Sequence, residues 1–546
     1  MKIAIAQFNP RVGDISQNVI RIAEWIEQAK EKGAELVVFP ELAVTGYPPK
    51  DFLSYPSFVD SSETAITTLS RVAKGIAVVV GFVEKNTTGI GAPFYNSAAV
   101  LSDGQCVERY RKQLLPTYDV FDESRYFEPG NQACVFEVSG VRFGLTICED
   151  AWNFPNLGMR EYPQQPLDAY RRQKLNFLIN LSASPFHLGK PDERIQLFSA
   201  GAQRVGSPLI VCNQVGGNDE LIFDGCSLVV EPSGSLLWKG QCFVEALEYF
   251  DTNKTTQLQP WGGSEAAWLW DALVLGVRDY ASKSGVTQAC LGLSGGIDSA
   301  VTLCVAAEAL GPEAVSAVSL PTRYTSSASV EDAQALADQL KVSFRNISVD
   351  GLFDAYQNLW KEQELGGLGS LTLENLQPRI RMTVLMALAN EENRLLLNTS
   401  NKSEIATGYA TLYGDSAGAL SVLGDLTKRQ VYLLANYLHE MRSWIPKRII
   451  DRPPTAELRE GQRDEESLPP YSVLDELVVA VVEKGWGKTK LLESGFDSKW
   501  VELFCRLHRV SEYKRNQLPP VLRVSRKAFG VGRRLPIAAK MSFLSE

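Results

Sequence analysis

The sequence predicts an α/β protein of two domains, a layered α/β domain followed by a doubly wound parallel sheet. Short β-rich runs alternate with helical or loop segments from residue 1 to about 250, which is typical of a layered domain. Apolar periodicity is then lost over residues 251–264, a stretch that contains Pro260-Trp-Gly-Gly263. We therefore expect a first domain at 1–250, a linker at 251–264 and a second domain at 265–546.

Six apolar runs predict the strands of the first domain. They are rich in branched aliphatic residues and phenylalanine, and polar or turn-forming residues separate them. The runs cover residues 2–6, 35–39, 76–80, 141–147, 177–180 and 209–212.

The second domain opens with an amphipathic helix, because Trp270, Leu273, Val274, Val277 and Ala281 recur at helical spacing. Strand-like runs at 289–293, 314–320 and 342–347 then alternate with helices at 300–310 and around 330–340. Such alternation predicts parallel strands, with a ligand bound at their carboxyl ends. Residues 451–470 hold nine charged residues and four prolines, so they form either a solvated linker or a mobile flap over a charged substrate.

Composition excludes several classes of protein. With 45% hydrophobic and 22% charged residues, the chain can bury large cores, and its net charge of -9 argues against nucleic-acid and anionic-membrane binding. The start has no apolar region of signal-peptide length, and no run approaches the roughly 18 apolar residues of a membrane span. Nine scattered cysteines without a Cys-x-x-Cys pair indicate a reducing cytoplasm and no structural zinc. Because only three histidines exist, we expect a carboxylate or a lysine as any catalytic base.

A Gly-rich turn between an apolar strand and an apolar helix predicts a phosphate site. Backbone N–H groups and hydroxyls of this turn can wrap a pyrophosphate, and its aspartate is a candidate magnesium ligand. The nucleotide loop G-x-x-x-x-G-K-[ST] is absent, which favours an enzyme that cuts ATP between the α and β phosphates. The alternative is an ordinary strand-to-helix turn. The candidate ATP-binding residues are Gly292, Leu293, Ser294, Gly295, Gly296, Ile297, Asp298 and Ser299.

Three residues of the first domain are candidates for one catalytic set: Glu41, Lys112 and Cys148, each at the end of a strand-like run. A cysteine can attack a carboxamide carbon if a carboxylate takes its proton, and a lysine can stabilise the developing oxyanion. Each residue also has an ordinary alternative, namely a buried strand cysteine, a strand-end glutamate and a surface lysine.

Four motifs follow one another along the first half of the chain. They are Phe39-Pro-Glu-Leu42, Tyr110-Arg-Lys-Gln-Leu-Leu-Pro116, Glu123 with Pro129-Gly130, and Thr146-Ile-Cys-Glu-Asp150. In this order they resemble the nitrilase, or carbon-nitrogen hydrolase, family. The resemblance implies an αββα sandwich, with Glu41, Lys112 and Cys148 as the catalytic triad and Glu123 as an additional active-site glutamate.

In the glutaminase branch of this family, Tyr118, Ser184 and Lys190 resemble the positions that hold glutamine. The lysine at 190 gives up the bidentate carboxylate contact of the arginine found in many relatives.

The second domain carries a further set of polar motifs beyond the phosphate loop. A strand at 395–398 enters a polar turn that begins at Thr399, which predicts a second ligand-binding element beside the ATP site. Lys428 opens a helix, where it is either a surface lysine or a phosphate contact. Because a helix start disfavours a cation unless an anion shares the site, we expect the phosphate contact. The other motifs are Glu374-Asn-Leu-Gln-Pro-Arg-Ile-Arg381, Asn401-Lys-Ser-Glu404, Gly408-Tyr-Ala-Thr-Leu-Tyr-Gly-Asp415, Pro453-Pro-Thr-Ala-Glu-Leu458, Ser467-Leu-Pro-Pro-Tyr471 and Tyr513-Lys-Arg-Asn-Gln517.

These strings resemble NAD synthetases, and the two domains together resemble the bacterial glutamine-dependent NAD synthetase family. The resemblance implies that Gly292 to Ser299 and Thr399 hold ATP, and that Mg²⁺ lies near Asp298 and Glu404. It also implies deamido-NAD contacts at Asn375, Glu404 and Lys514. The stretch 153–173, after Cys148, does not align with the family pattern.

The resemblance implies ATP-dependent amidation of deamido-NAD to NAD with ammonia from glutamine, through an adenylated intermediate. AMP, pyrophosphate and glutamate would be the other products. It further implies three small-molecule substrates, no nucleic-acid or membrane partner, a homo-oligomer and a cytoplasmic location. Two other functions stay open: an amidase whose second domain senses ATP, and a non-catalytic nucleotide-binding scaffold.

Overall fold

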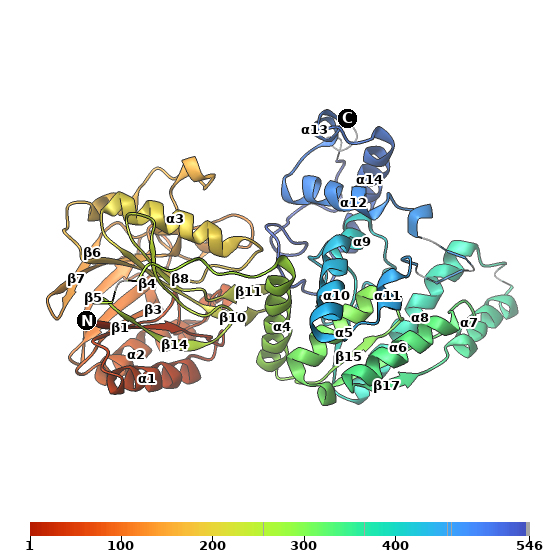
Figure 1. Cartoon of the computed structure of the whole chain (residues 1–546), viewed down its shortest axis with the longest axis horizontal. Helices are drawn as coiled ribbons and strands as arrows, with labels where there is room; N and C mark the ends of the chain where they lie inside the picture. Colours follow the sequence, from red (N-terminus) through yellow and green to blue (C-terminus); the bar gives the residue numbers. More distant parts are fainter. Residues whose placement is uncertain (255, 365, 456, 460, 463, 542–546) are drawn as a thin grey trace. The chain divides into compact units, whose positions relative to one another are not determined.

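The computed structural model describes every residue except 255, 365, 456, 460, 463 and 542–546, so parts of the expected linker and flap lie outside the described residues. The chain divides into two compact units (Figure 1). The first holds residues 1–218 and 222–262, and the second holds 219–221 and the chain from Gly263 onward. None of the described helices is long and apolar enough to cross a membrane.

The first unit consists of two six-stranded sheets packed face to face and covered by helices, which confirms the αββα sandwich. Their inner faces share one hydrophobic core that contains Ile3, Val79, Phe143 and Ile210. The first sheet has the order β14 (Ala246–Asp251), β1 (Lys2–Gln7), β2 (Leu36–Val38), β3 (Ala77–Lys85), β4 (Phe94–Ser102) and β5 (Gln105–Arg111). The second has the order β13 (Leu236–Lys239), β12 (Leu228–Val230), β9 (Leu209–Asn213), β8 (Phe177–Ser182), β7 (Val141–Ile147) and β6 (Cys134–Val138).

Helices close the two outer faces of this sandwich (Figure 1). The apolar stripe of α1 (Ile15–Glu31), formed by Ile15, Ile22 and Ile26, packs with α2 (Pro56–Val72) on the first sheet. The second sheet is covered by α3 (Lys190–Val205). In the described part of this unit, a hairpin and five short 3₁₀ segments complete the fold: β10 (Val215–Asn218) with β11 (Leu221–Asp224), and Lys50–Ser54, Glu123–Arg125, Cys148–Ala151, Pro155–Leu157 and Pro166–Tyr170.

The second unit is built on a five-stranded parallel sheet, which confirms the doubly wound prediction. The third strand in the sheet order, β15 (Ala289–Gly292), comes first in the chain, so the winding reverses beside it. The order is β17 (Ser343–Asn346), β16 (Val315–Ser319), β15, β18 (Leu395–Asn398) and β19 (Leu420–Ser421). The loops after β15 and β18 therefore open at the same edge of the sheet, where a doubly wound fold binds its ligand.

Twelve α-helices are described in the second unit, and side-chain caps fix the starts of two that border this edge. Asn401 and Glu404 form a reciprocal capping box at α9, and Thr427 and Gln430 form another at α10. The helices are α4 (Glu265–Ser284), α5 (Ile297–Leu310), α6 (Ser327–Leu340), α7 (Asp350–Glu362), α8 (Ser370–Glu391), α9 (Lys402–Thr407), α10 (Lys428–Arg442), α11 (Lys447–Asp451), α12 (Tyr471–Val478), α13 (Lys488–Glu493), α14 (Ser498–Val510) and α15 (Glu512–Arg515). Pro312–Ala314 and Asp464–Glu466 form 3₁₀ turns, and Val479–Glu483 form a π-helical turn.

Candidate active sites

Glu41, Lys112 and Glu123 form a buried ion cluster in the first unit. The Nζ atom of Lys112 lies 2.7 Å from Glu41 Oε1 and 2.7 Å from Glu123 Oε1. Asn96 Nδ2 and the backbone N–H of Ala183 donate to the Glu41 carboxylate at 2.7 and 2.9 Å, so both of its oxygens are oriented. Two carboxylates thus contact the ammonium group of Lys112, and all three side chains are buried.

Burial and the neighbouring charges shift the pKa values of Lys112 and Glu123. Although burial acts against it, the Glu123 and Glu41 carboxylates raise the pKa of Lys112 well above its usual value, so the ammonium stays charged. Burial raises the pKa of Glu123 to about 7, with Lys112 opposing and Glu41 adding to the shift. The Oε2 atom of Glu123 is buried and has no hydrogen-bond partner among the described residues. That oxygen is suited to accept a hydrogen bond from a substrate amide.

Cys148 lies at a sharp turn between β7 and the 3₁₀ segment Cys148–Ala151. Its φ of 42° is left-handed, a conformation that a non-glycine residue adopts only where the surrounding structure imposes it. Burial, and then the Glu41 charge, raise the pKa of the Cys148 thiol well above its usual value. The free site therefore holds a thiol, and attack requires a base such as Glu41 to take its proton as the thiol reacts.

Asp150 joins the strand end that bears Lys112 to the turn that bears Cys148. Its Oδ1 accepts the backbone N–H groups of Gln113 and Leu114 at 2.9 and 2.8 Å. Its Oδ2 accepts the Ile147 N–H at 3.1 Å and the Tyr110 hydroxyl at 2.8 Å. The sequence identified Asp150 only as part of a motif, because its four partners, from residues 110–114 and from Ile147, become visible only in the fold.

The three residues expected to hold glutamine lie on different elements around Cys148. The Tyr118 hydroxyl donates to Glu149 Oε1 at 2.9 Å, and Lys190, at the start of α3, lies 2.7 Å from Glu193 Oε1. The backbone of Ser184 is held on both sides, since its N–H donates to Asn213 Oδ1 at 3.0 Å and its carbonyl accepts from Arg194 at 2.8 Å.

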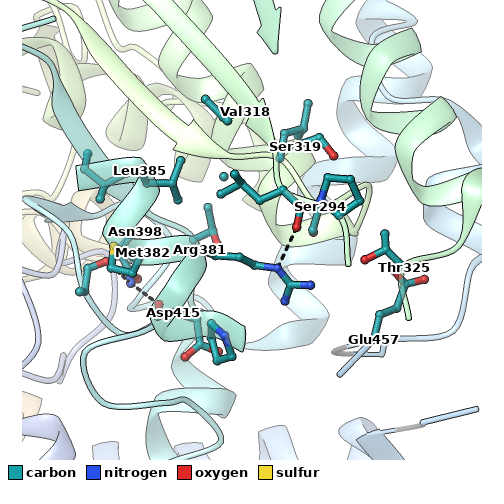
Figure 2. Close-up of a pocket in the computed structure, with 18 of the residues that line it drawn as sticks. Ser294, Val318, Ser319, Thr325, Arg381, Met382, Leu385, Asn398, Asp415 and Glu457 are labelled. Atoms are coloured by element: carbon teal, nitrogen blue, oxygen red, sulfur yellow. Dashed lines mark hydrogen bonds between the residues drawn. The ribbon is translucent and has the colours of Figure 1, made fainter. Parts of the chain in front are cut away.

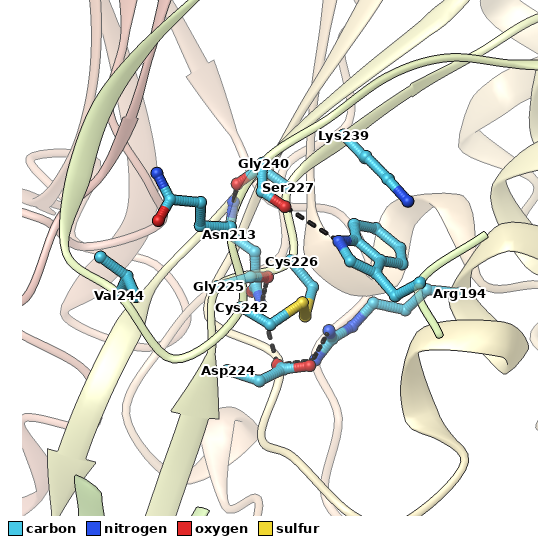
Figure 3. The surroundings of a disulfide bond; sticks show 12 residues. Arg194, Asn213, Asp224, Gly225, Cys226, Ser227, Lys239, Gly240, Cys242 and Val244 are labelled. Carbon is cyan, nitrogen blue, oxygen red and sulfur yellow. Dashed lines mark hydrogen bonds and ion pairs between the residues drawn. A yellow bond between two sulfur atoms is a disulfide. The ribbon is translucent and has the colours of Figure 1, made fainter. Parts of the chain in front are cut away.

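Arg194 is itself fixed by a buried ion pair with Asp224, at 2.7 Å (Figure 3). Cys226, two residues after Asp224, forms a disulfide with Cys242, with an S–S distance of 2.07 Å (Figure 3). A β-bridge between Gly225 and Cys242 brings the two cysteines together. This disulfide was not predicted from the sequence. The two cysteines are 16 residues apart, and the scattered cysteines had indicated only a reducing compartment.

In the second unit, the loop after β15 has the shape of a phosphate cradle. Gly295 has a φ of 81°, and a Cβ atom there would lie 2.2 Å from the Ser329 carbonyl oxygen, so only glycine fits. The Ser294 and Ser299 hydroxyls lie 3.2 Å apart, and the N–H of Gly296 donates to Ser294 Oγ at 3.2 Å. The start of α5 follows directly; among the described residues it has no side-chain cap, and such a helix start attracts anions.

Lys428 is buried beside this loop, so its reading as a surface lysine is wrong. Its Nζ lies 2.5 Å from Asp298 Oδ2 and 3.3 Å from Glu404 Oε1. Despite burial, these carboxylates raise the pKa of Lys428. Burial raises the pKa of Glu404 to about 8, with Lys428 opposing and Asp298 adding to the shift. Asn401 Nδ2 donates to Asp298 Oδ1 at 2.9 Å, which holds the aspartate toward the lysine.

The donor set around Asp298 fits a magnesium ion only together with a substrate. No group of three His, Cys, Asp or Glu side chains could hold a metal in the part of the chain that the structure describes. Asp298 and Glu404 offer two carboxylates, and magnesium usually takes one or two of these with phosphate oxygens and water. The chemistry of these residues therefore suits a metal that arrives with a polyphosphate.

Two cavities meet at this edge of the sheet. One, of about 250 Å³, is lined by Gly292, Leu293, Ser294 and Thr399 together with apolar residues such as Val318 and Leu385 (Figure 2). Arg381 lines this cavity (Figure 2), and its Nε donates to the Leu320 carbonyl at 3.0 Å. The second cavity, of about 190 Å³, is lined by Ser294, Gly296, Ile297, Asp298, Ser299, Thr399, Glu404 and Lys428. The apolar cavity can hold the base of a nucleotide, and the polar cavity can hold its phosphates.

Asn375 and Lys514 lie apart from these cavity linings, around the segment 408–411. Asn375 Oδ1 accepts from the Thr411 hydroxyl at 2.9 Å. Lys514 Nζ donates to the carbonyls of Gly408 and Ala410 at 2.8 and 2.7 Å. The structure thus groups these two predicted residues with each other, while Glu404 lines the polar cavity.

The segment expected to be a linker or a flap borders both cavities. Arg452 donates to Ser329 Oγ at 2.9 Å and pairs with Asp332, and Glu457 accepts from the same Ser329 hydroxyl at 2.8 Å. Arg452 and Glu457 line the polar cavity, and Glu457 and Leu458 line the other. Charge density alone pointed to this segment, but Arg452 was not singled out because its partners are more than 100 residues away.

Known proteins resemble the chain over its whole length. A family model of carbon-nitrogen hydrolases matches residues 2–254, and one of NAD synthases matches residues 269–518. The glutamine-dependent NAD(+) synthetases of Synechocystis sp. and Acinetobacter baylyi are 42% and 40% identical, each with 98% of both chains covered.

Two solved structures agree with this pattern. The glutamine-dependent NAD+ synthetase of Acinetobacter baumannii, in complex with ADP, has a TM-score of 0.77 and 38% identity, covering 98% of each chain. The enzyme of Cytophaga hutchinsonii, at 23% identity, has a TM-score of 0.85 with 100% and 99% of the two chains covered, which shows the shared fold.

Proposed function

Because the chain belongs to the glutamine-dependent NAD(+) synthetase family, we infer that its two sites carry the two halves of one amidation. The enzyme converts deamido-NAD to NAD with ATP and glutamine. The observation that carries this conclusion is the match over 98% of both chains, which includes both sites. We propose a glutaminase domain at 1–250, a linker at 251–264 and a synthetase domain at 265–546, in keeping with the ranges of the two family models.

In the first half-reaction, Cys148 is the nucleophile and Glu41 the base. Glu41 takes the thiol proton as Cys148 Sγ attacks the side-chain carboxamide carbon of glutamine, and Lys112, 2.7 Å from Glu41, faces the developing oxyanion. The proton then passes to the leaving nitrogen, so ammonia departs and a glutamyl thioester remains. Water hydrolyses the thioester to glutamate. Glu123 holds Lys112 in place, and Tyr118, Ser184 and Lys190 hold the rest of glutamine.

In the second half-reaction, the nicotinate carboxylate of deamido-NAD attacks the α phosphorus of ATP, and pyrophosphate leaves. Ammonia then displaces AMP from the adenylate and gives the amide of NAD. The residues Gly292–Ser299, Thr399 and Lys428 bind ATP, with Lys428 opposite the phosphate charge. Asn375, Glu404 and Lys514 contact deamido-NAD.

Asp298 and Glu404 would hold a magnesium ion that accompanies ATP. Bound there, the ion would neutralise phosphate charge. Lys428 already lies between these carboxylates, so it orients them and keeps their repulsion low before a nucleotide binds. A homo-oligomer and a cytoplasmic location stay predictions from the family resemblance.

The products test this function against the amidase whose second domain only senses ATP. We expect the purified protein, with deamido-NAD, ATP, Mg²⁺ and glutamine, to form AMP and NAD in equal amounts. An amidase with an ATP sensor would release glutamate and ammonia without AMP. Formation of ADP and phosphate in place of AMP and pyrophosphate would contradict the adenylate.

A further inference from the structure

The stretch 153–173, which does not align with the family pattern, folds against the residue next to Cys148 in the glutaminase site. Asn153, only 7% exposed, fixes it from within. Its Nδ2 donates to the carbonyls of Tyr162 and Gln164 at 3.0 and 2.6 Å, and its Oδ1 accepts the N–H of Tyr162 at 3.2 Å. Gln165 closes the loop by donating to the Asn153 carbonyl at 2.8 Å. One buried amide five residues after Cys148 therefore sets where Tyr162 lies.

Tyr162 meets the residue next to the nucleophile. Its hydroxyl donates to Glu149 Oε1 at 2.7 Å, the same oxygen that accepts from Tyr118 at 2.9 Å. Glu149 is 4% exposed, so two phenols orient a nearly buried carboxylate beside Cys148. The Arg160 guanidinium lies over both phenol rings, 5.5 Å from the centroid of Tyr118 and 5.6 Å from that of Tyr162.

Glutamine brings two charges to this site in addition to its reacting carboxamide. Its α-ammonium group needs an anion, and its α-carboxylate needs a cation, because an unpaired charge would be desolvated at a cost. Lys190 places a point charge over the Trp152 ring, at 4.1 Å from its centroid. A lysine cannot form the two parallel bonds with which an arginine grips a carboxylate. The guanidinium of Arg160 can form these two bonds, and it lies over the ring of Tyr118, whose hydroxyl contacts Glu149.

We propose that the 153–165 segment is a specificity element of the glutaminase site. Arg160 binds the α-carboxylate of glutamine together with Lys190, and Tyr162 is a positioning residue that, with Tyr118, holds Glu149 for the α-ammonium group. The proposal rests on the proposed function, since it assumes that glutamine is hydrolysed at Cys148. It assigns a substrate contact to Arg160 and a positioning role to Tyr162, in a stretch that the family resemblance left without one.

The test compares three amides in the Cys148-dependent release of ammonia. L-Glutamine carries both charges, L-glutaminamide lacks the α-carboxylate charge, and glutaramate (4-carbamoylbutanoate) lacks the α-amino group. The variants are Arg160→Gln and Tyr162→Phe. Arg171→Gln is the matched control for the first, because Arg171 is a 61% exposed residue of the same stretch. Tyr126→Phe is the control for the second, because its hydroxyl donates to Asp51 on the surface, at 2.7 Å.

We expect Arg160→Gln to lower kcat/KM for glutamine about tenfold or more, chiefly through KM, while glutaminamide changes less than about twofold. We expect Tyr162→Phe to lower the preference for glutamine over glutaramate about fivefold or more, because Glu149 loses one of its two donors. The controls should match the wild type, and all four variants should keep the ammonium-driven synthesis of NAD, because that reaction bypasses the glutaminase site. Retained hydrolysis of L-glutaminamide shows that the glutaminase unit of each variant folds.

Equal losses with all three amides would overturn the proposal, since a merely structural role does not distinguish substrates by charge. Unchanged glutamine kinetics in both variants would overturn it as well. If the wild-type protein itself released no ammonia from glutamine, the proposed function would fail instead, so the two failures are separable.

Discussion

The charge state of Lys190 should make kcat/KM for glutamine depend on pH, and Lys190→Arg should remove that dependence. Lys190 is buried, and burial lowers its pKa to about 8 even though Glu193, at 2.7 Å, favours the charged form. A lysine with a lowered pKa is charged below that value and neutral above it. If Lys190 binds the glutamine carboxylate, kcat/KM for glutamine falls as pH rises through about 8, because this ratio reports the free enzyme.

The size of the effect follows from that pKa. At pH 9, one unit above the value of about 8, roughly one lysine in eleven is still charged, so kcat/KM should be about tenfold lower than at neutral pH. Lys190→Arg keeps a charge at every pH of the experiment, since the guanidinium pKa exceeds roughly 12. We therefore expect the variant to keep its kcat/KM through this window, and a lower KM at pH 9 than the wild type.

The assay is glutamine-driven NAD formation between about pH 7 and 9, with the ratio of variant to wild type as the quantity compared. The α-amino group of glutamine titrates in the same range, but it affects both proteins equally and cancels in the ratio. The same ratio with ammonium as nitrogen source should stay flat, because that reaction bypasses Lys190. If the ratio with glutamine were also flat across pH 8, the role of Lys190 would be refuted.

Two further predictions concern one residue in each unit. Asp150→Asn keeps an acceptor for Gln113 and Leu114 but turns an NH₂ group toward Ile147 N–H and the Tyr110 hydroxyl, so we expect about 2–4 kcal/mol less free energy of unfolding in urea. Asp168→Asn, at an exposed pair with Arg204, should cost under about 1 kcal/mol, and equal effects of the two would contradict the buried clamp. Gly295→Ala places a Cβ 2.2 Å from the Ser329 carbonyl in a left-handed residue, so NAD formation should fall more than about tenfold with either nitrogen source. Glutamine hydrolysis should persist, and normal ATP kinetics in this variant would rule out the loop as the phosphate site.

Much of the fold could be predicted because the decisive signals are local. The buried parallel strands are continuous apolar runs, and the loop after β15 is a Gly-rich turn between such a run and a helix. The antiparallel pair β4 and β5 was not predicted, although Asp103-Gly104 between them is a hairpin turn signal and Asp103 has a φ of 49°. That pair matters because Lys112 follows β5 directly.

The site was predictable in its residue types but not in its electrostatics. Lys428 was predicted as a phosphate contact, but its buried ion pairs were not, because the carboxylates that neutralise it, Asp298 and Glu404, are 130 and 24 residues away along the chain. Asn96 and Asp150 were missed for the same reason, since a buried amide or carboxylate is defined by its partners in space. The roles of Tyr162 and Arg160 depend on the Asn153 clamp, which no periodicity or spacing encodes.

The central claim, that Cys148 supplies ammonia to a separate ATP-dependent site, is tested most directly by Cys148→Ala. NAD formation is measured from deamido-NAD, ATP and Mg²⁺, once with glutamine and once with ammonium. We predict that the glutamine-driven rate is lost and that the ammonium-driven rate stays near that of the wild type. Loss of both rates in a folded protein, or retention of both, would contradict the division of the reaction between two sites.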